Sequence, residues 1–239
     1  THASAQVIST YINSLSDAFD DYKMNTCLSK AHFLAQVLTE SGEFKYTKEL
    51  GGPFDYDPWR GRGLIQITGQ DNYSDYGTYA GIDVTSNQNA MENLERSPHA
   101  MLSAAWFFDV SRGLISEADK DDFNWITRII NGGFNGYNTR LAYFNRITSV
   151  LNMDTCLKLN KQGKYLFEDS KIYNDKRGAF AWGLWHDPGL TKDGVTKNKD
   201  EALKGYRRYV ALDDAAGQPK DSHGLPLDKK WYGIVLTLT

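Results

Sequence analysis

Cysteine and histidine are scarce in this chain, and their scarcity argues against the common metal sites. The 239 residues include two cysteines and five histidines, and none of them follows the close spacing of a zinc-binding motif. We therefore predict no metal and no cofactor. Cys27 and Cys156 lie far apart in the sequence, and we expect two free, partly buried thiols, as in a protein made in a reducing compartment.

Long apolar runs, internal repeats and an excess of basic charge are also missing. Without a long apolar run we expect no membrane-spanning helix. A formal net charge of -3 argues against nucleic acid as the main partner. The first residues have neither the basic nor the apolar part of a signal sequence. Because the chain does not start with methionine, we expect it to be part of a longer protein, and no export route can be assigned from this segment.

One stretch of apolar residues repeats at helical spacing and leads up to a glutamate. These residues are Ala31, Leu34, Ala35 and Leu38. The spacing predicts an amphipathic helix, capped by Thr26 or Ser29, that ends at Glu40. The negative end of the helix dipole and the apolar neighbours would both raise the pKa of Glu40, which suits a general acid. The alternative is an ordinary solvated glutamate at a helix end.

Further carboxylates follow this helix closely. Hydrolysis of a glycosidic bond needs two carboxyl groups, and an inverting enzyme holds them about 6.5–9.5 Å apart to leave room for a water molecule. Glu49 lies in a predicted loop that can supply this separation, whereas Glu43 follows the helix too closely to do so easily. Asp55 and Asp57 are further candidates, and spacing alone leaves the choice open.

Three short motifs occur in order along the chain. They are Thr39-Glu40-Ser41-Gly42, the run from Arg60 to Gly69 (Arg-Gly-Arg-Gly-Leu-Ile-Gln-Ile-Thr-Gly), and Ile129-Ile130-Asn131-Gly132-Gly133. The second motif lacks the Gly-Lys-Ser/Thr ending of a phosphate-binding loop. Together the motifs resemble glycoside hydrolase family 19, which comprises plant-type chitinases and many bacteriophage endolysins. The short separation of Glu40 and Glu49 is similar to the endolysin branch.

The resemblance implies roles for individual residues. Glu40 corresponds to the general acid of the family, and Glu49 to the second catalytic carboxylate. Residues expected to bind the sugar or the water are Gln66, Thr68, Tyr73, Asn131 and Arg140, with Arg146 as an alternative to Arg140. Amide and hydroxyl groups suit sugar hydroxyls, and the rings of Tyr56, Trp59 and Tyr73 suit pyranose faces. Each also has a structural alternative: backbone partners for Gln66 and Thr68, a helix cap for Asn131, and core positions for the aromatics.

The sequence predicts a mainly α fold. We expect a lysozyme-like helical domain with a loop-built substrate groove over residues 1–157, and a C-terminal extension of mixed α/β character over residues 158–239. Besides the helix that ends at Glu40, the predicted helices cover residues 8–19, 98–112, 121–130, 139–151 and 201–210. The extension is a wall-binding region, a lid, or an integral part of the same domain.

These features predict a lysozyme-like enzyme that cleaves the β-1,4 bond between N-acetylmuramic acid and N-acetylglucosamine in peptidoglycan, by acid/base catalysis. Its site of action would be the bacterial cell wall, as a phage endolysin or as an antibacterial effector (toxin) with an immunity protein as partner. A chitinase is the alternative within the enzyme class. A glycan-binding module without catalysis is the alternative of another class, and a helical scaffold with chance likeness is the third.

Overall fold

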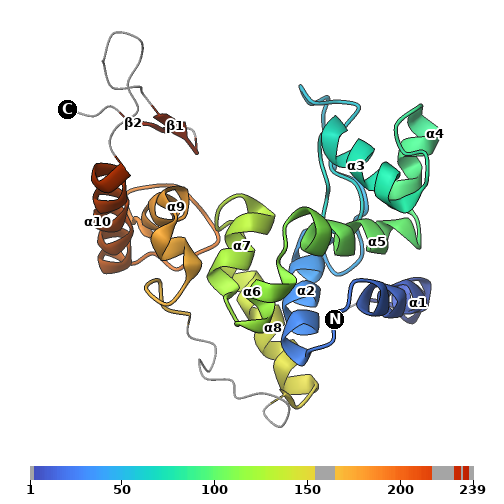
Figure 1. Ribbon diagram of the computed structural model, residues 1–239, viewed down its shortest axis with the longest axis horizontal. Coiled ribbons are helices and arrows are strands. Elements are labelled where there is room, and N and C mark those ends of the chain that lie inside the picture. Colours follow the sequence, from blue (N-terminus) through green and yellow to red (C-terminus); the bar gives the residue numbers. More distant parts are fainter. Residues whose placement is uncertain (1–2, 154–164, 217–228, 233, 237–239) are drawn as a thin grey trace. The chain divides into compact units, whose positions relative to one another are not determined.

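The computed structural model describes residues 3–153, 165–216, 229–232 and 234–236 (Figure 1). The chain divides into two compact units, and each contains segments that are far apart in sequence. The first unit comprises residues 1–121 and 139–163, and the second comprises residues 122–138 and 164–239.

Helices and connecting loops build the first unit. Its elements are α1 (Ala5–Asp21), α2 (Cys27–Glu40), α3 (Gln70–Ala80), α4 (Gln88–Met91), the 3-10 turn η1 (Glu92–Glu95), α5 (His99–Trp106), the π-helical turn η2 (Phe107–Ser111) and α6 (Ile115–Asp119). Helix α8 (Tyr137–Val150) begins in the second unit and continues in the first. Between α2 and α3, residues 41–69 form the long loop that carries most of the predicted site.

Helix α2 begins and ends where its sequence requires. The Thr26 side chain accepts a hydrogen bond from the Ser29 backbone, and the Ser29 side chain accepts one from the Thr26 backbone, which forms a capping box. At the other end, Gly42 adopts a φ of 55°, which is easily reached by glycine, and the next backbone N–H bonds back to Leu38. The predicted end at Glu40 is thereby confirmed.

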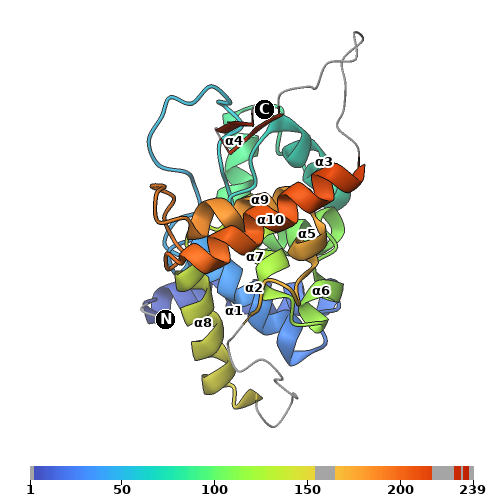
Figure 2. The same ribbon diagram turned by 90° about the vertical axis from the view of Figure 1, so that its left-hand side faces the viewer.

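Helices also dominate the second unit. Its elements are α7 (Phe123–Asn131), the 3-10 turn η4 (Lys171–Asn174), α9 (Lys176–His186), α10 (Lys199–Ala216), β1 (Lys229–Trp231) and β2 (Ile234–Leu236). Helices α9 and α10 lie side by side (Figure 2). Gly183 and Gly205 meet at this contact, because a Cβ atom on Gly205 would lie 2.4 Å from the Gly183 nitrogen. Two glycines without side chains therefore allow the two helix backbones to approach closely.

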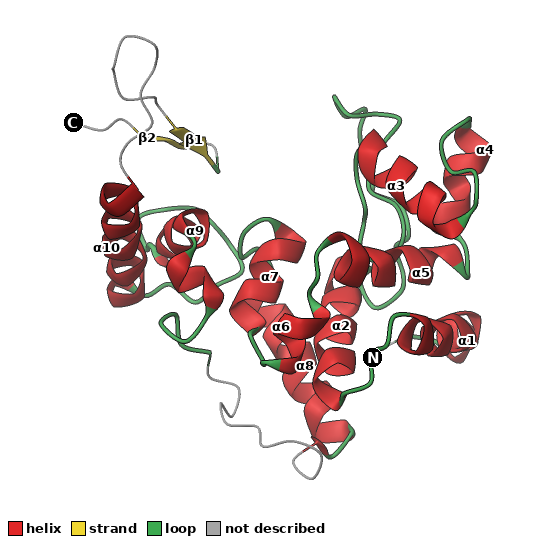
Figure 3. Cartoon of the chain, in the orientation of Figure 1, coloured by secondary structure: helices red, strands yellow, loops and turns green. Residues whose placement is uncertain are grey.

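The prediction of a mainly α fold is confirmed (Figure 3). The mixed α/β character predicted for the extension is not supported beyond one antiparallel pair, β1 with β2, because the rest of its described regular structure is helical. The Trp/Gly-rich part of the extension, Ala181 to His186, lies in α9. Its Trp182 and Trp185 pack edge-on against Phe134 in the core of the second unit.

The extension is bonded to a segment that lies before residue 157. The Asn124 side chain in α7 donates to the backbone oxygens of Tyr165 and Leu166, at 3.2 and 3.3 Å. The Asp122 carboxylate accepts hydrogen bonds from the Ser170 hydroxyl at 2.5 Å and the Lys171 backbone N–H at 2.7 Å. These bonds favour the integral extension among the three alternatives. The domain boundary at residue 157 stays a prediction.

Two further expectations concern Cys27 and the membrane. Cys27 is disulfide-bonded, so the expectation of a free thiol is wrong at this position. The other cysteine, Cys156, lies outside the described residues. No helix in the described ranges combines the length and apolar character that crossing a bilayer requires.

Candidate active site

Glu40 lies at the last position of α2, where an arginine from α8 contacts its carboxylate. The Arg140 Nη2 atom forms an ion pair with Glu40 Oε1. The other terminal nitrogen, Nη1, donates to the side-chain oxygen of Gln36 at 2.6 Å. Arg140 is 3% exposed and Glu40 is 19% exposed. The guanidinium therefore fixes a carboxylate that remains partly open to solvent.

The packing of α2 on α8 explains why these three side chains meet. His32, Gln36 and Glu40 follow one another at intervals of four residues, so they lie on the same face of α2. His32 is fully buried, packs with its ring tilted against the Phe144 ring of α8 at 4.4 Å between ring centroids, and bonds to Asp121 at 2.9 Å. The contact between α2 and α8 is thus buried on the side of Glu40 that leads to His32, and this packing limits movement of Arg140.

Glu43 stays beside α8, close to the end of α2. It has a φ of 64°, in the left-handed region, and its carboxylate accepts a hydrogen bond from the Tyr143 hydroxyl at 2.8 Å. Burial, and then the hydrogen bond to Glu43, raise the pKa of Tyr143. Glu43 therefore contacts the same helix, α8, that supplies Arg140 to Glu40.

Glu49 lies on a short extended segment that pairs with the second motif. Backbone hydrogen bonds join Glu49 to Gly61 at 2.8 Å and Gly63 to Thr47 at 2.9 Å. The Glu49 carboxylate accepts two further hydrogen bonds, from the Tyr56 hydroxyl at 2.8 Å and from the Gly61 backbone N–H at 2.9 Å. The bond to Glu49 raises the pKa of the Tyr56 hydroxyl. The loop therefore fixes both oxygens of Glu49.

Gln66 is brought next to Glu49 by the absence of a side chain at Gly61. A Cβ atom on Gly61 would lie 2.9 Å from the Gln66 side-chain oxygen and 3.4 Å from Glu49 Cβ. Gln66 has a φ of 58°, which is costly for a residue other than glycine and is found mainly where the surroundings enforce it. Its side-chain amide donates to the Gly63 backbone oxygen at 2.7 Å, and the Thr68 hydroxyl donates to the Gln66 backbone oxygen at 3.0 Å.

Tyr73 has a position that differs from the predicted one. It is fully buried, and its hydroxyl donates to the Arg60 backbone oxygen at 2.5 Å and accepts from Arg62 Nη1 at 2.6 Å. Trp59 packs edge-on against the Tyr73 ring. A fully buried ring offers no face to a sugar, so the predicted sugar contact of Tyr73 is wrong for this conformation. The structural alternative, a core position, describes it better.

Asn131 belongs to the second unit, at the end of α7. Its side-chain oxygen accepts the Asn135 backbone N–H at 2.9 Å, and Gly132 follows it with a φ of 76°. It therefore closes the helix end, as in the structural alternative. Its contribution to a sugar groove stays a prediction.

Two outcomes concern residues around Glu40. Arg140, and not its alternative Arg146, is the arginine that contacts Glu40. The sequence reasoning missed Gln36, although it lies four residues before Glu40, and the helical period could have placed it on the same face.

Across the described ranges, no group of three or more His, Cys, Asp or Glu side chains is arranged to hold a metal ion.

Comparison with curated proteins finds a relative whose name includes a family. The glycosyl hydrolase family 19 domain-containing protein of Haemophilus influenzae (strain ATCC 51907 / DSM 11121 / KW20 / Rd) is 34% identical over 93 residues. The match covers 38% of this chain and 42% of that relative, so the chain spans less than half of its length. No family model matches the chain.

Two solved structures resemble the chain over most of their own length. Chitinase C from Streptomyces griseus HUT6037 has a TM-score of 0.50 and 23% identity, and the match covers 62% of this chain and 89% of that one. The family 19 class IV chitinase from Zea mays has a TM-score of 0.48 and 22% identity, covering 63% of this chain and 82% of that one. The likeness to the first shows a shared fold.

Proposed function

We propose that this chain, whose resemblance to glycoside hydrolase family 19 (chitinase-like) is confirmed by the curated relative, hydrolyses β-1,4 bonds of a glycan that contains N-acetylglucosamine. The observation that carries the proposal is the placement of two carboxylates near the junction of α2 and its following loop. Glu40 is held by Arg140, and Glu49 by Tyr56 and Gly61. Carboxyl groups with fixed positions are the central requirement of this chemistry.

In this proposal Glu40 acts as the general acid and gives its proton to the oxygen of the leaving sugar. The Arg140 guanidinium then stabilises the carboxylate that remains on Glu40. Because Gln36 holds the other nitrogen of the same guanidinium, Arg140 stays in place while the charge on Glu40 changes.

Glu49 acts as the general base and takes a proton from the water that attacks the anomeric carbon. The Tyr56 hydroxyl and the Gly61 N–H orient its carboxylate, which leaves the remaining lone pairs for that water. Gln66 lies beside Glu49 and offers an amide for the water or for a sugar hydroxyl. Attack from the face opposite the leaving group inverts the anomeric centre.

We assign peptidoglycan as the substrate, cleaved between N-acetylmuramic acid and N-acetylglucosamine. The support is the run from Arg60 to Gly69 together with the short separation of Glu40 and Glu49, both similar to the endolysin branch. Chitin is the second candidate, because the Streptomyces protein with a shared fold is a chitinase. The setting would be a phage endolysin or a delivered antibacterial effector acting on the cell wall, the latter with an immunity protein.

Digestion of purified peptidoglycan and of soluble chitin oligomers tests this proposal. The native protein is compared with Glu40→Gln and Glu49→Gln, and with Glu43→Gln as the matched control, since the Glu43 carboxylate accepts a hydrogen bond from Tyr143 and has no role in the proposed mechanism. Mass spectrometry identifies the new reducing ends. We expect muramic acid ends from the native protein and from Glu43→Gln, and at least a 100-fold loss in the other two variants.

Other outcomes would redirect the assignment. Cleavage of chitin oligomers alone would make the protein a chitinase. Binding of either glycan without any product would make it a non-catalytic module. Retention of the anomeric configuration, measured by NMR in the first minutes, would contradict the roles given to Glu49 and the water.

A further inference from the structure

A polar pocket of about 320 Å³ lies next to the Glu49 segment, in the first unit. Its lining residues are Lys48, Asp57, Pro58, Arg60, Arg62 and Gln88. Three of these side chains are cationic and one is anionic, in a chain whose formal net charge is -3. Such a concentration of positive charge in a concave surface favours anions locally.

The pairing of two segments explains why the cations gather there. Lys48 and Arg62 are bridge partners in an antiparallel pair, so their side chains project from the same face. Glu49 and Gly61 are the next pair along and belong to the opposite face. The pocket and the Glu49 carboxylate therefore lie on opposite faces of this two-stranded pair. Lys48 faces the pocket, and the next residue, Glu49, faces the other side.

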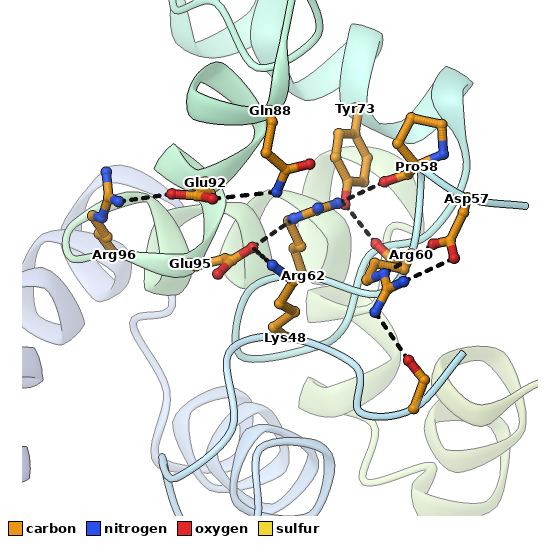
Figure 4. Close-up of polar contacts among 11 residues, drawn as sticks. Lys48, Asp57, Pro58, Arg60, Arg62, Tyr73, Gln88, Glu92, Glu95 and Arg96 are labelled. Carbon is orange, nitrogen blue, oxygen red and sulfur yellow. Dashed lines mark hydrogen bonds and ion pairs between the residues drawn. The ribbon is translucent and has the colours of Figure 1, made fainter. Parts of the chain in front are cut away.

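The ion pairs around the pocket do not neutralise all of its cationic side chains (Figure 4). Arg60 makes two bonds of 2.8 Å to Asp57, and Lys48 and Arg62 converge on a single carboxylate oxygen of Glu95, at 3.3 and 2.7 Å. Three cations thus share two carboxylates. Asp57, the one anionic lining residue, has both oxygens engaged by Arg60 and a backbone N–H.

Arg62 adds a buried donor to this arrangement. Its side chain is 1% exposed, with Nε bonded to Glu95 and Nη1 bonded to the Pro58 oxygen and the Tyr73 hydroxyl. Its remaining nitrogen, Nη2, makes no hydrogen bond to any of the described residues. A guanidinium held this rigidly keeps its charge in one place, and its remaining nitrogen can donate to one oxygen of an anion.

We propose that this pocket binds a carboxylate of the substrate, supplied by the peptide stems of peptidoglycan. The inference rests on the proposed function and deepens it, because peptide-bearing glycan carries free carboxylates and chitin does not. Lys48 and Arg60 supply partly exposed charge, with side chains 37% and 21% exposed, and Arg62 supplies a buried donor. The pocket would therefore select an acidic glycan over a neutral one.

The first test compares glycan strands that bear their peptide carboxylates with the same strands after conversion of these carboxylates to methylamides. Lys48→Gln is the variant, and Lys45→Gln is the control, since Lys45 is exposed and does not line the pocket. We expect the native protein to prefer the charged strands by about five- to tenfold in kcat/KM, the size expected for one hydrogen bond at a partly exposed site. Lys48→Gln should lose that preference, and Lys45→Gln should keep it. Equal rates on both strands with the native protein would overturn the proposal.

A binding measurement separates this inference from the proposed function. Calorimetric titration of the native protein with muramyl dipeptide, which carries a free carboxylate, is compared with titration of its methyl ester. Tighter binding of the acid, abolished by Lys48→Gln, supports the pocket even if no glycan is hydrolysed. Absence of any difference overturns the pocket even if hydrolysis is found. Titration with methyl phosphate forms a third arm, and tighter binding of phosphate than of carboxylate would overturn the peptide stem as the ligand source.

Discussion

Replacement of Arg140 by methionine is the sharpest test of the site geometry. Methionine preserves the long, unbranched stem and a good helix propensity in α8, so the change removes the guanidinium and little else. Two partners then lose their donor, the Glu40 carboxylate and the Gln36 side-chain oxygen. Both lie on one face of α2, and Gln36 is fully buried.

The magnitude follows from the exposure of the two partners. Removal of one member of a buried ion pair costs about 3–5 kcal/mol. Glu40 retains 19% of its side-chain exposure, so water can partly solvate the freed carboxylate, and we take about 3 kcal/mol as the cost at this residue. A buried acceptor without a partner adds about 1 kcal/mol at Gln36. We therefore expect a loss of about 4 kcal/mol in the free energy of unfolding.

Chemical denaturation, followed by tryptophan fluorescence, measures this loss. Arg146→Met is the matched control, because this exposed arginine on the same helix was the alternative to Arg140, and we expect its cost to stay within about 0.5 kcal/mol. If Arg140→Met is too unstable to purify, Arg140→Lys supplies a milder form of the same comparison. Equal losses for Arg140→Met and Arg146→Met would refute the reasoning.

A double variant shows whether Gln36 and Arg140 act together. In Gln36→Met with Arg140→Met, the buried acceptor is gone together with its donor, so the combined cost should be smaller than the sum of the two single costs by about 1 kcal/mol. Additive costs would mean that the 2.6 Å bond between them contributes nothing measurable.

Three other predictions concern Tyr56, Tyr73 and Cys27. Tyr56→Phe removes one donor to Glu49 at a residue that is 41% exposed, so hydrolysis should fall about tenfold while the unfolding free energy, from the same denaturation curves, changes by less than about 0.5 kcal/mol. Tyr73→Phe should do the reverse, with a loss of about 1–3 kcal/mol in stability because Arg62 loses a buried acceptor, and an unchanged KM. Thiol titration of the protein unfolded without reductant should find no free thiol at Cys27; a reactive Cys27 in a peptide map would contradict the disulfide.

Local pattern was sufficient to predict the position of Glu40. The helical period of α2, its cap at Thr26 and its end before Gly42 are all set by neighbours within a few residues. The link to Arg140 came instead from the resemblance of the motifs, since the two residues are 100 positions apart and periodicity carries no information over that range. The same separation in sequence explains why local pattern could not decide between Arg140 and Arg146 as the partner of Glu40.

The errors arose where tertiary contacts decide between two uses of one residue. A tyrosine after the second motif suits a sugar face and a core equally well, and only the position of Arg62, anchored on Glu95, places the Tyr73 hydroxyl inside. The extension was predicted to have mixed α/β character, whereas its helices α9 and α10 approach so closely at Gly183 that no side chain fits between them. That contact depends on a second glycine 22 positions later, which the local pattern of α9 does not show.

The two carboxylates of the proposed site depend on different levels of structure. Glu49 takes its donors from residues seven and 12 positions away, within one loop, whereas Glu40 takes its donor from α8 across 100 positions. Loss of the α8 packing would therefore free Glu40 first and leave the Glu49 loop paired.

If both carboxylates are required, activity should disappear at a denaturant concentration at which the loop is still folded. Hydrogen exchange at the Glu49 and Gly61 amides, compared with residual hydrolysis at each concentration, measures this order. Simultaneous loss of protection and activity would show that the two positions unfold as one unit, and that the loop has no stability of its own.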